Sequence, residues 1–241
     1  MSEYVLLLHK ERKFLVRRGV VNTHVGRVDI SNAKIGEKVS AGGEEFVVVE
    51  PTITDLLEKC RRGAQIIMPK DAAQIVAVTG VGRGWRCLDG GSGSGFLAIF
   101  LGHIVGSEGK VYTYEKRKEF YEKARKNISM CGMDGIVEIK NEDMGNFDEE
   151  GLDMVTFDLK GAENLVGRAF EHLKSGGWLV VYSPHIEQQI KVRSEMEKSG
   201  FSHIKMVENI QREWKSVAGY THPFPRGIMH TGFLTFGRKI A

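Results

Sequence analysis

The strongest constraint on the fold is a regular alternation of strand-like and helix-like segments that begins near residue 87. Short β-rich runs (CLD, VYTYE, IVEIK, MVTFD and WLVVYS) alternate with helical segments that we place at 95–105, 117–130, 162–173 and 186–198. This alternation predicts parallel strands with right-handed crossovers. Two further β-rich runs, 203–214 and 229–237, have no obvious helix between them, so we expect them to form an antiparallel hairpin.

The region before this alternation has a different pattern. Residues 4–8 (YVLLL), 13–17 (KFLVR) and 46–50 (FVVVE) are short β-rich runs, and NTHVGR and SAGGEE supply turn residues between them. The pattern predicts a small antiparallel β module that ends near Pro51. Two helices, over 52–60 and 71–80, are expected to follow it.

Composition and cysteine spacing narrow the class of protein. The 241 residues are 41% hydrophobic and 27% charged, which is ordinary for a globular chain. No apolar run reaches the roughly 18 residues of a membrane span, and the N-terminus lacks the basic region of a signal peptide. Cys60, Cys87 and Cys131 are widely spaced, which favours apolar roles in a reducing compartment over a zinc site or disulfides. We therefore expect a cytoplasmic protein with no metal site and no membrane partner.

The charge of the chain permits a nucleic-acid partner but does not require one. The formal net charge is only +3. Residues 1–28 have a balance of +4, from Lys10, Arg12, Lys13, Arg17, Arg18 and Arg27 against Glu3 and Glu11. An RNA-binding surface and a solvated hairpin face explain this pattern equally well.

The first run of the alternation leads into a glycine-rich stretch, CLDGGSGSGFLAIF, from Cys87 to Phe100. Glycine costs about 0.5–1 kcal/mol relative to alanine inside a regular element, so these glycines indicate a tight turn, a close ligand, or both. Ligands of open α/β sheets bind at the switch in strand order. Two cofactors remain open here. Gly93-x-Gly95-x-x-Ala98 fits a dinucleotide fingerprint, and S-adenosylmethionine needs a similar loop without any phosphate to neutralise.

Acidic residues at the ends of four consecutive strands favour S-adenosylmethionine over a dinucleotide. These residues are Asp89, Glu115, Asp143 and Asp158. Each alone could be a helix N-cap or a turn residue, but together with the glycine loop they predict a cofactor site. Asp89 would repel a pyrophosphate and suits the cationic methionine part of S-adenosylmethionine. Glu115 is placed for ribose hydroxyls, and Asp143 for the adenine amino group.

Several longer segments then point to one family. They are RRGAQIIMPKDAA (61–73), DGGSGSG (89–95), YEKR (114–117), YSP (182–184) with Gln188, and HTGFLTFGRK (230–239). On these segments the chain resembles the tRNA (adenine-N1)-methyltransferase family, TrmI type, over nearly its whole length. The resemblance implies a small β domain over 1–60. It also implies a Rossmann-like class I methyltransferase domain over 61–241, with a mostly parallel seven-stranded sheet and a C-terminal antiparallel hairpin.

The resemblance also implies an activity and an assembly. We expect a homotetramer that uses S-adenosylmethionine to methylate N1 of an adenosine in the tRNA T-loop, at position 58, with 57 as a further candidate. The predicted cofactor-binding residues are Gln65, Asp89, Gly91, Gly93, Ser94, Gly95, Phe96, Leu97, Glu115, Asp143 and Asp158. Asp158 is also the predicted catalytic residue, because a carboxylate that accepts a hydrogen bond from the exocyclic amine makes N1 more nucleophilic.

Contacts to RNA are harder to assign. Tyr182 could stack on the target base or close the edge of the core, and Arg212 and Arg226 are candidate phosphate contacts. The chain departs from the family after Asp158, where DLKGAEN lacks the proline of the D-L/V-x-x-P motif that shapes the target pocket. Two other functions stay open: methylation of a protein or small molecule on the same scaffold, and a non-catalytic RNA-binding subunit. The intact loop and acids disfavour the subunit.

Overall fold

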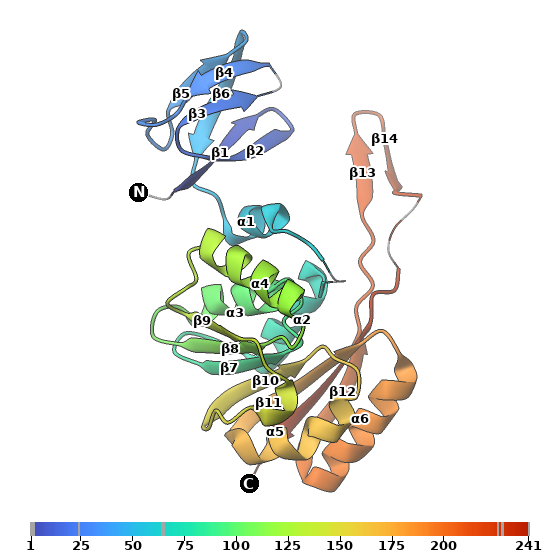
Figure 1. Cartoon of the computed structure of the whole chain (residues 1–241). Coiled ribbons are helices and arrows are strands. Elements are labelled where there is room, and N and C mark those ends of the chain that lie inside the picture. Colours follow the sequence, from blue (N-terminus) through green and yellow to red (C-terminus); the bar gives the residue numbers. More distant parts are fainter. Residues whose placement is uncertain (1–2, 24, 64–65, 226, 228, 241) are drawn as a thin grey trace. The chain divides into compact units, whose positions relative to one another are not determined.

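The structure is a computed structural model that describes residues 3–23, 25–63, 66–225, 227 and 229–240. The chain divides into two compact units, Met1–Cys60 and Arg61–Ala241, and each is described by itself. Figure 1 shows the elements of both units, coloured along the chain.

The first unit is built mainly from antiparallel strands. Its four-stranded sheet has the order β2-β1-β6-β5, and a two-stranded sheet pairs β3 with β4. The elements are β1 (Tyr4–His9), β2 (Arg12–Arg17), β3 (Val20–Thr23), β4 (Gly26–Asp29), β5 (Lys38–Ala41), β6 (Glu44–Val49) and α1 (Ile53–Lys59). In β6, Phe46 and Val48 are buried while Glu45 faces solvent, which is the two-residue period of a sheet with one covered face. The strands β3, β4 and β5 were not predicted, because each is only four residues long.

The second unit has a seven-stranded sheet of order β12-β15-β11-β10-β7-β8-β9. Its strands are β7 (Arg86–Gly90), β8 (Lys110–Tyr114), β9 (Val137–Lys140), β10 (Leu152–Phe157), β11 (Leu173–Ser183), β12 (Phe201–Glu208) and β15 (Phe233–Lys239). The five strands from β11 to β9 are parallel to one another, and β15 is antiparallel to both β11 and β12. The predicted fold class, a mostly parallel sheet with an antiparallel C-terminal pair, is confirmed.

Helices cover both faces of this sheet (Figure 1). They are α2 (Pro69–Thr79), α3 (Phe96–Val105), α4 (Lys118–Met130), α5 (Val166–His172) and α6 (Ile186–Ser199), with short 3-10 turns η1 (Met144–Asn146) and η2 (Ala162–Leu165). The α3 helix packs against β7, β8 and β9, whereas α5 and α6 pack against β11. The core on the second side includes Phe157, Leu179, Met196 and Phe201. The helix predicted over 162–173 is instead a 3-10 turn, the short helix α5 and the start of β11.

A long excursion interrupts the antiparallel pair at the C-terminus. Between β12 and β15 the chain forms a hairpin of β13 (Trp214–Val217) and β14 (Tyr220–Pro223), which projects from the end of the sheet (Figure 1). The β-rich run predicted over 203–214 is therefore a strand only in its first part, and that part pairs antiparallel with β15, as predicted for 229–237. β12 ends at Glu208, and the backbone carbonyl of Asn209 accepts a hydrogen bond from the Lys70 ammonium at 2.7 Å instead of continuing the ladder. No helix among the described residues is long and apolar enough to cross a membrane.

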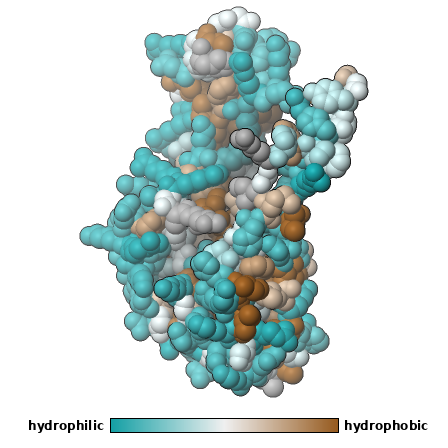
Figure 2. All heavy atoms as spheres, turned by 90° about the vertical axis from the view of Figure 1, so that its right-hand side faces the viewer, coloured by the Kyte–Doolittle hydropathy of each residue, from teal (hydrophilic) through white to brown (hydrophobic). Residues whose placement is uncertain are grey.

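The surface of the chain is mostly hydrophilic on the face shown in Figure 2, with hydrophobic side chains gathered in patches. Many of the exposed large hydrophobic side chains come from one stretch of sequence around the excursion. They are Met206, Ile210, Trp214, Val217, Tyr220, Phe224 and Met229. Apolar groups concentrated on one projecting segment are more typical of a contact surface than of a surface that faces only water.

Candidate active site

The switch in strand order falls beside β7, which has β8 on one side and β10 on the other. At this point the glycine loop is held by its neighbours through backbone hydrogen bonds. The amides of Gly91 and Ser92 donate to the carbonyl of Tyr114 at 3.2 and 3.0 Å, and the amide of Asp158 donates to the carbonyl of Gly90 at 2.8 Å. The ends of β7, β8 and β10 therefore meet in one place, where ligands of open α/β sheets bind.

Gly91 is the position at which the loop requires glycine. Its φ is +92°, and a Cβ added there would lie 2.2 Å from the carbonyl oxygen of Asp158. Any side chain would push the loop away from the end of β10. Gly95, with φ +80°, occupies the N-cap of α3. The glycines thus bring the backbone close to Asp158 and allow α3 to begin directly after the loop.

Asp89 is buried at the end of β7. Its two carboxylate oxygens accept hydrogen bonds from the hydroxyls of Thr113 at 2.8 Å and Thr156 at 2.9 Å, on the two flanking strands. Burial raises the pKa of Asp89 to about 6, the two threonines act against this, and the charge of Glu115 raises it further. Asp89 is thus fixed in place but short of positive charge.

Glu115 follows β8 and holds the glycine loop through a hydrogen bond to its backbone. Its side chain is 5% exposed, and Oε2 accepts a hydrogen bond from the amide of Gly93 at 3.1 Å. Oε1 accepts from the backbone amide of Arg117 at 2.9 Å. Asp143 is further out. It accepts a hydrogen bond from the amide of Gly145 at 2.9 Å, caps the short turn η1, and leaves most of its side chain exposed.

Asp158 differs from the other three acids. Its side chain is partly buried, and its carboxylate has no hydrogen bond or ion pair with any residue that the structure describes. Burial raises its pKa to about 7, and the negative charge of Asp89 adds to this effect. A carboxylate held in this way favours a cation or a hydrogen-bond donor supplied from outside the chain.

Two adjoining hollows share Asp158. The larger has a volume of about 590 Å³ and is lined by Gly91, Gly93, Glu115, Asp143 and Asp158 among others. The smaller, of about 20 Å³, shares Gly91, Gly93 and Asp158 and adds the predicted residues Asp89, Ser94, Phe96 and Leu97. The structure thus brings ten predicted cofactor residues to one place, since Gly95 caps α3 beside them. The eleventh, Gln65, lies outside the described residues.

The residues present fit S-adenosylmethionine better than a dinucleotide. Asp89, Glu115 and Asp158 put negative charge around the loop, which suits a sulfonium and an ammonium group and would repel a pyrophosphate. The hydroxyl of Ser92, also in the wall of the smaller hollow, is buried and has no partner among the described residues. An unsatisfied buried hydroxyl and an unpartnered carboxylate in one cavity indicate a polar ligand between them.

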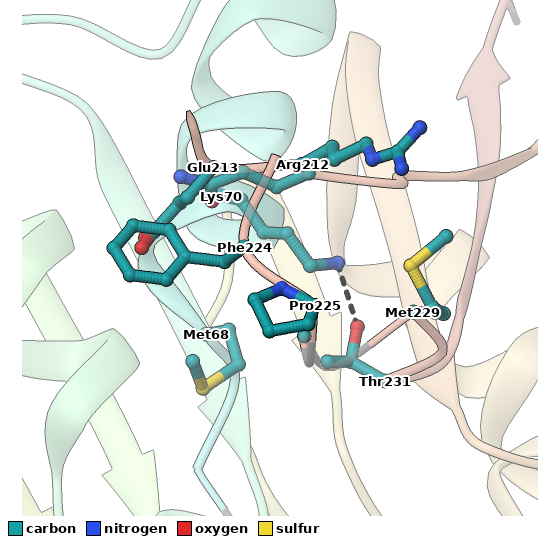
Figure 3. A pocket seen from close by; sticks show the side chains of 10 residues that line it. Met68, Lys70, Arg212, Glu213, Phe224, Pro225, Met229 and Thr231 are labelled. Carbon is teal, nitrogen blue, oxygen red and sulfur yellow. Dashed lines mark hydrogen bonds between the residues drawn. The ribbon is translucent and has the colours of Figure 1, made fainter. Parts of the chain in front are cut away.

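Two of the predicted RNA contacts, Tyr182 and Arg212, do not line either hollow. Tyr182 is 4% exposed and its hydroxyl donates to the carbonyl of Thr231 at 2.6 Å. A ring buried in this way presents no face to a base, so the geometry favours the alternative, an aromatic that closes the core edge. Arg212 is exposed, lies 5.8 Å from the ring of Trp214, and lines a separate cavity shown in Figure 3. Arg226 lies outside the described residues.

The basic N-terminal segment is largely paired within its own unit. Lys13 binds Asp55 at 3.0 Å, Arg17 pairs with Glu3, and Arg18 donates to the carbonyl of Ala33 at 2.6 Å. These contacts favour the interpretation as a solvated hairpin face.

One supporting residue of the site was not predicted, and one departure from the family can now be located. Asn127, buried in α4, donates to the carbonyl of Ser94 at 2.8 Å and so supports the glycine loop. Its position on the apolar face of a predicted helix was the available signal. The residue at the place of the family's proline, Ala162, is fully buried in the core. The cavity wall there is made by Leu159, Lys160 and Gly161, so the missing proline is a difference behind the wall.

A sheet of this order, with carboxylates around a glycine loop at its switch point, is that of a class I methyltransferase, the enzymes that use S-adenosylmethionine as methyl donor. The model of the family described as the tRNA methyltransferase complex GCD14 subunit matches residues 48–219. The chain belongs to this family, and the resemblance seen in the sequence is confirmed.

Similar proteins cover the full length of the chain. A tRNA (adenine(57)-N(1)/adenine(58)-N(1))-methyltransferase TrmI from Methanocaldococcus jannaschii is 33% identical, over 99% of this chain and 95% of that protein. Among solved structures, a SAM-dependent O-methyltransferase from Thermotoga maritima has a TM-score of 0.87 at 30% identity, covering 100% of this chain and 94% of that one. TrmI from Aquifex aeolicus has a TM-score of 0.81 at 26% identity, covering 100% and 98%.

Proposed function

We propose that the protein transfers the methyl group of S-adenosylmethionine to N1 of an adenosine in the tRNA T-loop, at position 58, with 57 as a further candidate. The names of the TrmI relatives support the substrate and the position. The observation that carries the chemistry is Asp158, whose carboxylate lies in the wall of both hollows and has no partner in the described part of the chain. When bound, S-adenosylmethionine supplies an electrophilic methyl group on a cationic sulfur.

The four acidic residues at the strand ends have different roles in this proposal. Asp89 would hold the cationic end of the donor, Glu115 would bind its ribose hydroxyls, and Asp143 would bind its adenine amino group. Asp158 accepts a hydrogen bond from the exocyclic amine of the target adenine. This contact raises electron density at N1 and stabilises the positive charge that the base acquires. N1 is unprotonated at neutral pH, so no residue has to remove a proton from it.

The raised pKa of Asp158 suits this role. At neutral pH, with a pKa of about 7, the side chain is only partly ionised in the free protein. A cation in the adjoining hollow lowers that pKa and produces the carboxylate form, which can accept the hydrogen bond. Asp158 thus becomes competent to receive adenine when the donor is in place.

The test is to incubate purified protein with unmodified tRNA and labelled donor, and to digest the product to nucleosides. Label in 1-methyladenosine, lost when A58 and A57 of the tRNA are replaced, supports the proposal. Asp158→Ala should abolish most of the turnover and leave donor affinity within a few-fold. The name of the Thermotoga maritima structure supports a second candidate, transfer to an oxygen of another acceptor. Label elsewhere, with tRNA unmodified, would favour that function.

We infer that the chain works as a homotetramer, and the projecting hairpin supports self-association. An isolated two-stranded hairpin is marginal in water, yet Trp214 and Tyr220 are 57% and 56% exposed on β13 and β14. A second copy would cover these side chains. The three buried free cysteines support a reducing, cytoplasmic location. Light scattering at micromolar concentration tests the assembly, and Trp214→Ser should shift it towards smaller species.

A further inference from the structure

A second cluster of buried polar side chains lies at the N-terminal end of α2, outside the loop just described. Lys70 and Asp71 form an ion pair of 2.8 Å, with side chains only 10% and 1% exposed. The ammonium of Lys70 also donates to the hydroxyl of Thr231 at 2.7 Å, drawn as the dashed line in Figure 3. That hydroxyl in turn donates to the other oxygen of Asp71 at 2.7 Å. The three side chains therefore form a closed hydrogen-bonded ring.

The same dipeptide holds Asn209. Lys70 donates to the backbone carbonyl of Asn209 at 2.7 Å, and the side-chain amide of Asn209 donates to the carbonyl of Lys70 at 3.2 Å. Asn209 and Thr231 lie at the two ends of the excursion that carries β13 and β14. Lys70 and Asp71 thus clamp both ends of residues 209–231 to α2. We call these four residues the clamp.

The clamp is fully satisfied, which distinguishes it from an accidental ion pair. The three ammonium hydrogens of Lys70 have three acceptors, and both oxygens of Asp71 have donors. A buried ion pair contributes to stability only under such conditions, and removing one partner leaves an uncompensated charge. The arrangement therefore specifies a single position for both ends of the excursion.

The clamp borders the region around Asp158. Tyr182 donates to the carbonyl of Thr231, and a Cβ on Gly232 would lie 2.5 Å from the Tyr182 ring, so the chain packs tightly there. Burial raises the pKa of Tyr182 to about 12, and the charges of both Asp71 and Asp158 add to this. Tyr182 therefore contacts the clamp through Thr231, and it directly follows Val181, which pairs with Phe157, the residue before Asp158.

The clamp also frames the cavity of Figure 3, which has a volume of about 680 Å³. Lys70 and Thr231 line it directly, and its other walls come from α2's start and from the excursion: Met68, Gln211, Arg212, Glu213, Phe224, Pro225, Gly227 and Met229. Apolar faces beside an exposed guanidinium suit a nucleotide, whose base packs on the apolar groups while its phosphate meets the arginine. The residue before Met68, Ile67, lines the smaller hollow with Asp158.

We propose that Lys70 and Asp71 are positioning residues for the acceptor RNA: by clamping both ends of residues 209–231 they hold the walls of this cavity in the arrangement that receives a nucleotide beside Asp158. The inference rests on the proposed function, because it takes RNA as the acceptor. It assigns the clamp to the RNA side of the reaction and leaves donor binding independent of it.

The test compares Thr231→Val with Thr231→Ser and with Thr79→Val. Thr79 is a matched control, because its hydroxyl is similarly buried on the same unit and bonds only to backbone. We expect Thr231→Val to raise the KM for tRNA about tenfold and to accelerate amide hydrogen exchange across 209–231, with donor affinity by calorimetry within twofold. Thr231→Ser should restore both values, and Thr79→Val should change neither.

Asn209→Ala is measured in parallel, so that a poorly folding Thr231→Val does not decide the question. The inference is overturned if these variants leave both the KM and the exchange of 209–231 unchanged, or if donor affinity falls as much as kcat/KM. Failure of the proposed function looks different. The wild-type protein would then transfer no label to tRNA, while hydrogen exchange still reports whether the clamp holds the excursion.

Discussion

Replacing Asp158 with asparagine should make the protein more stable at high pH while removing its activity. The pKa of Asp158 is raised from 3.8 to about 7, mainly because the side chain is buried. The folded state therefore binds this proton more tightly than the unfolded chain does. As the pH rises from about 4 to above 7, the folded state must hold an unfavourable charge, and stability falls. An asparagine carries no such charge at any pH.

The size of this change in stability follows from the difference between the pKa of Asp158 in the folded protein and its ordinary value. A difference of 7 − 3.8, about 3 pKa units, corresponds to roughly 4 kcal/mol above pH 8, at about 1.4 kcal/mol per unit. The side chain is partly exposed, and solvent screens part of this energy, so we expect ~2 kcal/mol. The carboxylate would thus be one of the larger single costs to the folded state, because most substitutions change stability by about 0.5–3 kcal/mol.

Urea unfolding followed by tryptophan fluorescence measures this difference. All three tryptophans, Trp85, Trp178 and Trp214, lie in the unit Arg61–Ala241, so the signal reports the unit that contains Asp158. The free energy of unfolding of Asp158→Asn should exceed that of the wild type by ~2 kcal/mol at pH 9. The difference should be much smaller at pH 5, where Asp158 is protonated in the folded wild type. The exposed Asp134→Asn serves as control and should leave the free energy of unfolding unchanged at both pH values. An Asp158→Asn variant that is equally or less stable at pH 9 would refute the reasoning.

Three further predictions concern the loop and its supports. Donor binding at pH 7 should release protons, because a cation lowers the raised pKa of Asp158, and calorimetry in two buffers of different ionisation enthalpy should show less release for Asp158→Asn. Gly91→Ala should abolish donor binding, because its Cβ would clash with a backbone oxygen. The control Gly132→Ala, at φ +68° in open space, should retain donor affinity and lower the free energy of unfolding in urea by only about 1–2 kcal/mol. Asn127→Ala should weaken donor binding several-fold through loss of its bond to Ser94, and wild-type affinity in this variant would contradict a supporting role.

The sequence by itself determined the features that depend on neighbours along the chain. The alternation from residue 87 defines the parallel sheet, and Asp89, Glu115 and Asp158 could be placed at strand ends because the carboxyl ends of parallel strands share one edge. Gly91 could be recognised for the same reason, since its requirement arises between a strand and the following helix. Local pattern was sufficient wherever a residue's role follows from its place in one strand–loop–helix unit.

Tertiary structure decided what depends on residues far apart in the sequence. Only the contacts within the unit show that Asp158 and Ser92 have no partner among the described residues. Tyr182 and Thr231 join segments 49 residues apart, so no local pattern could show that this ring is buried and not available to a base. Lys70 likewise meets Thr231 across 161 residues. Burial and charge compensation are properties of the packed chain. They distinguish the carboxylate of Asp158, which is available to a ligand, from that of Asp71, which is bound within the clamp.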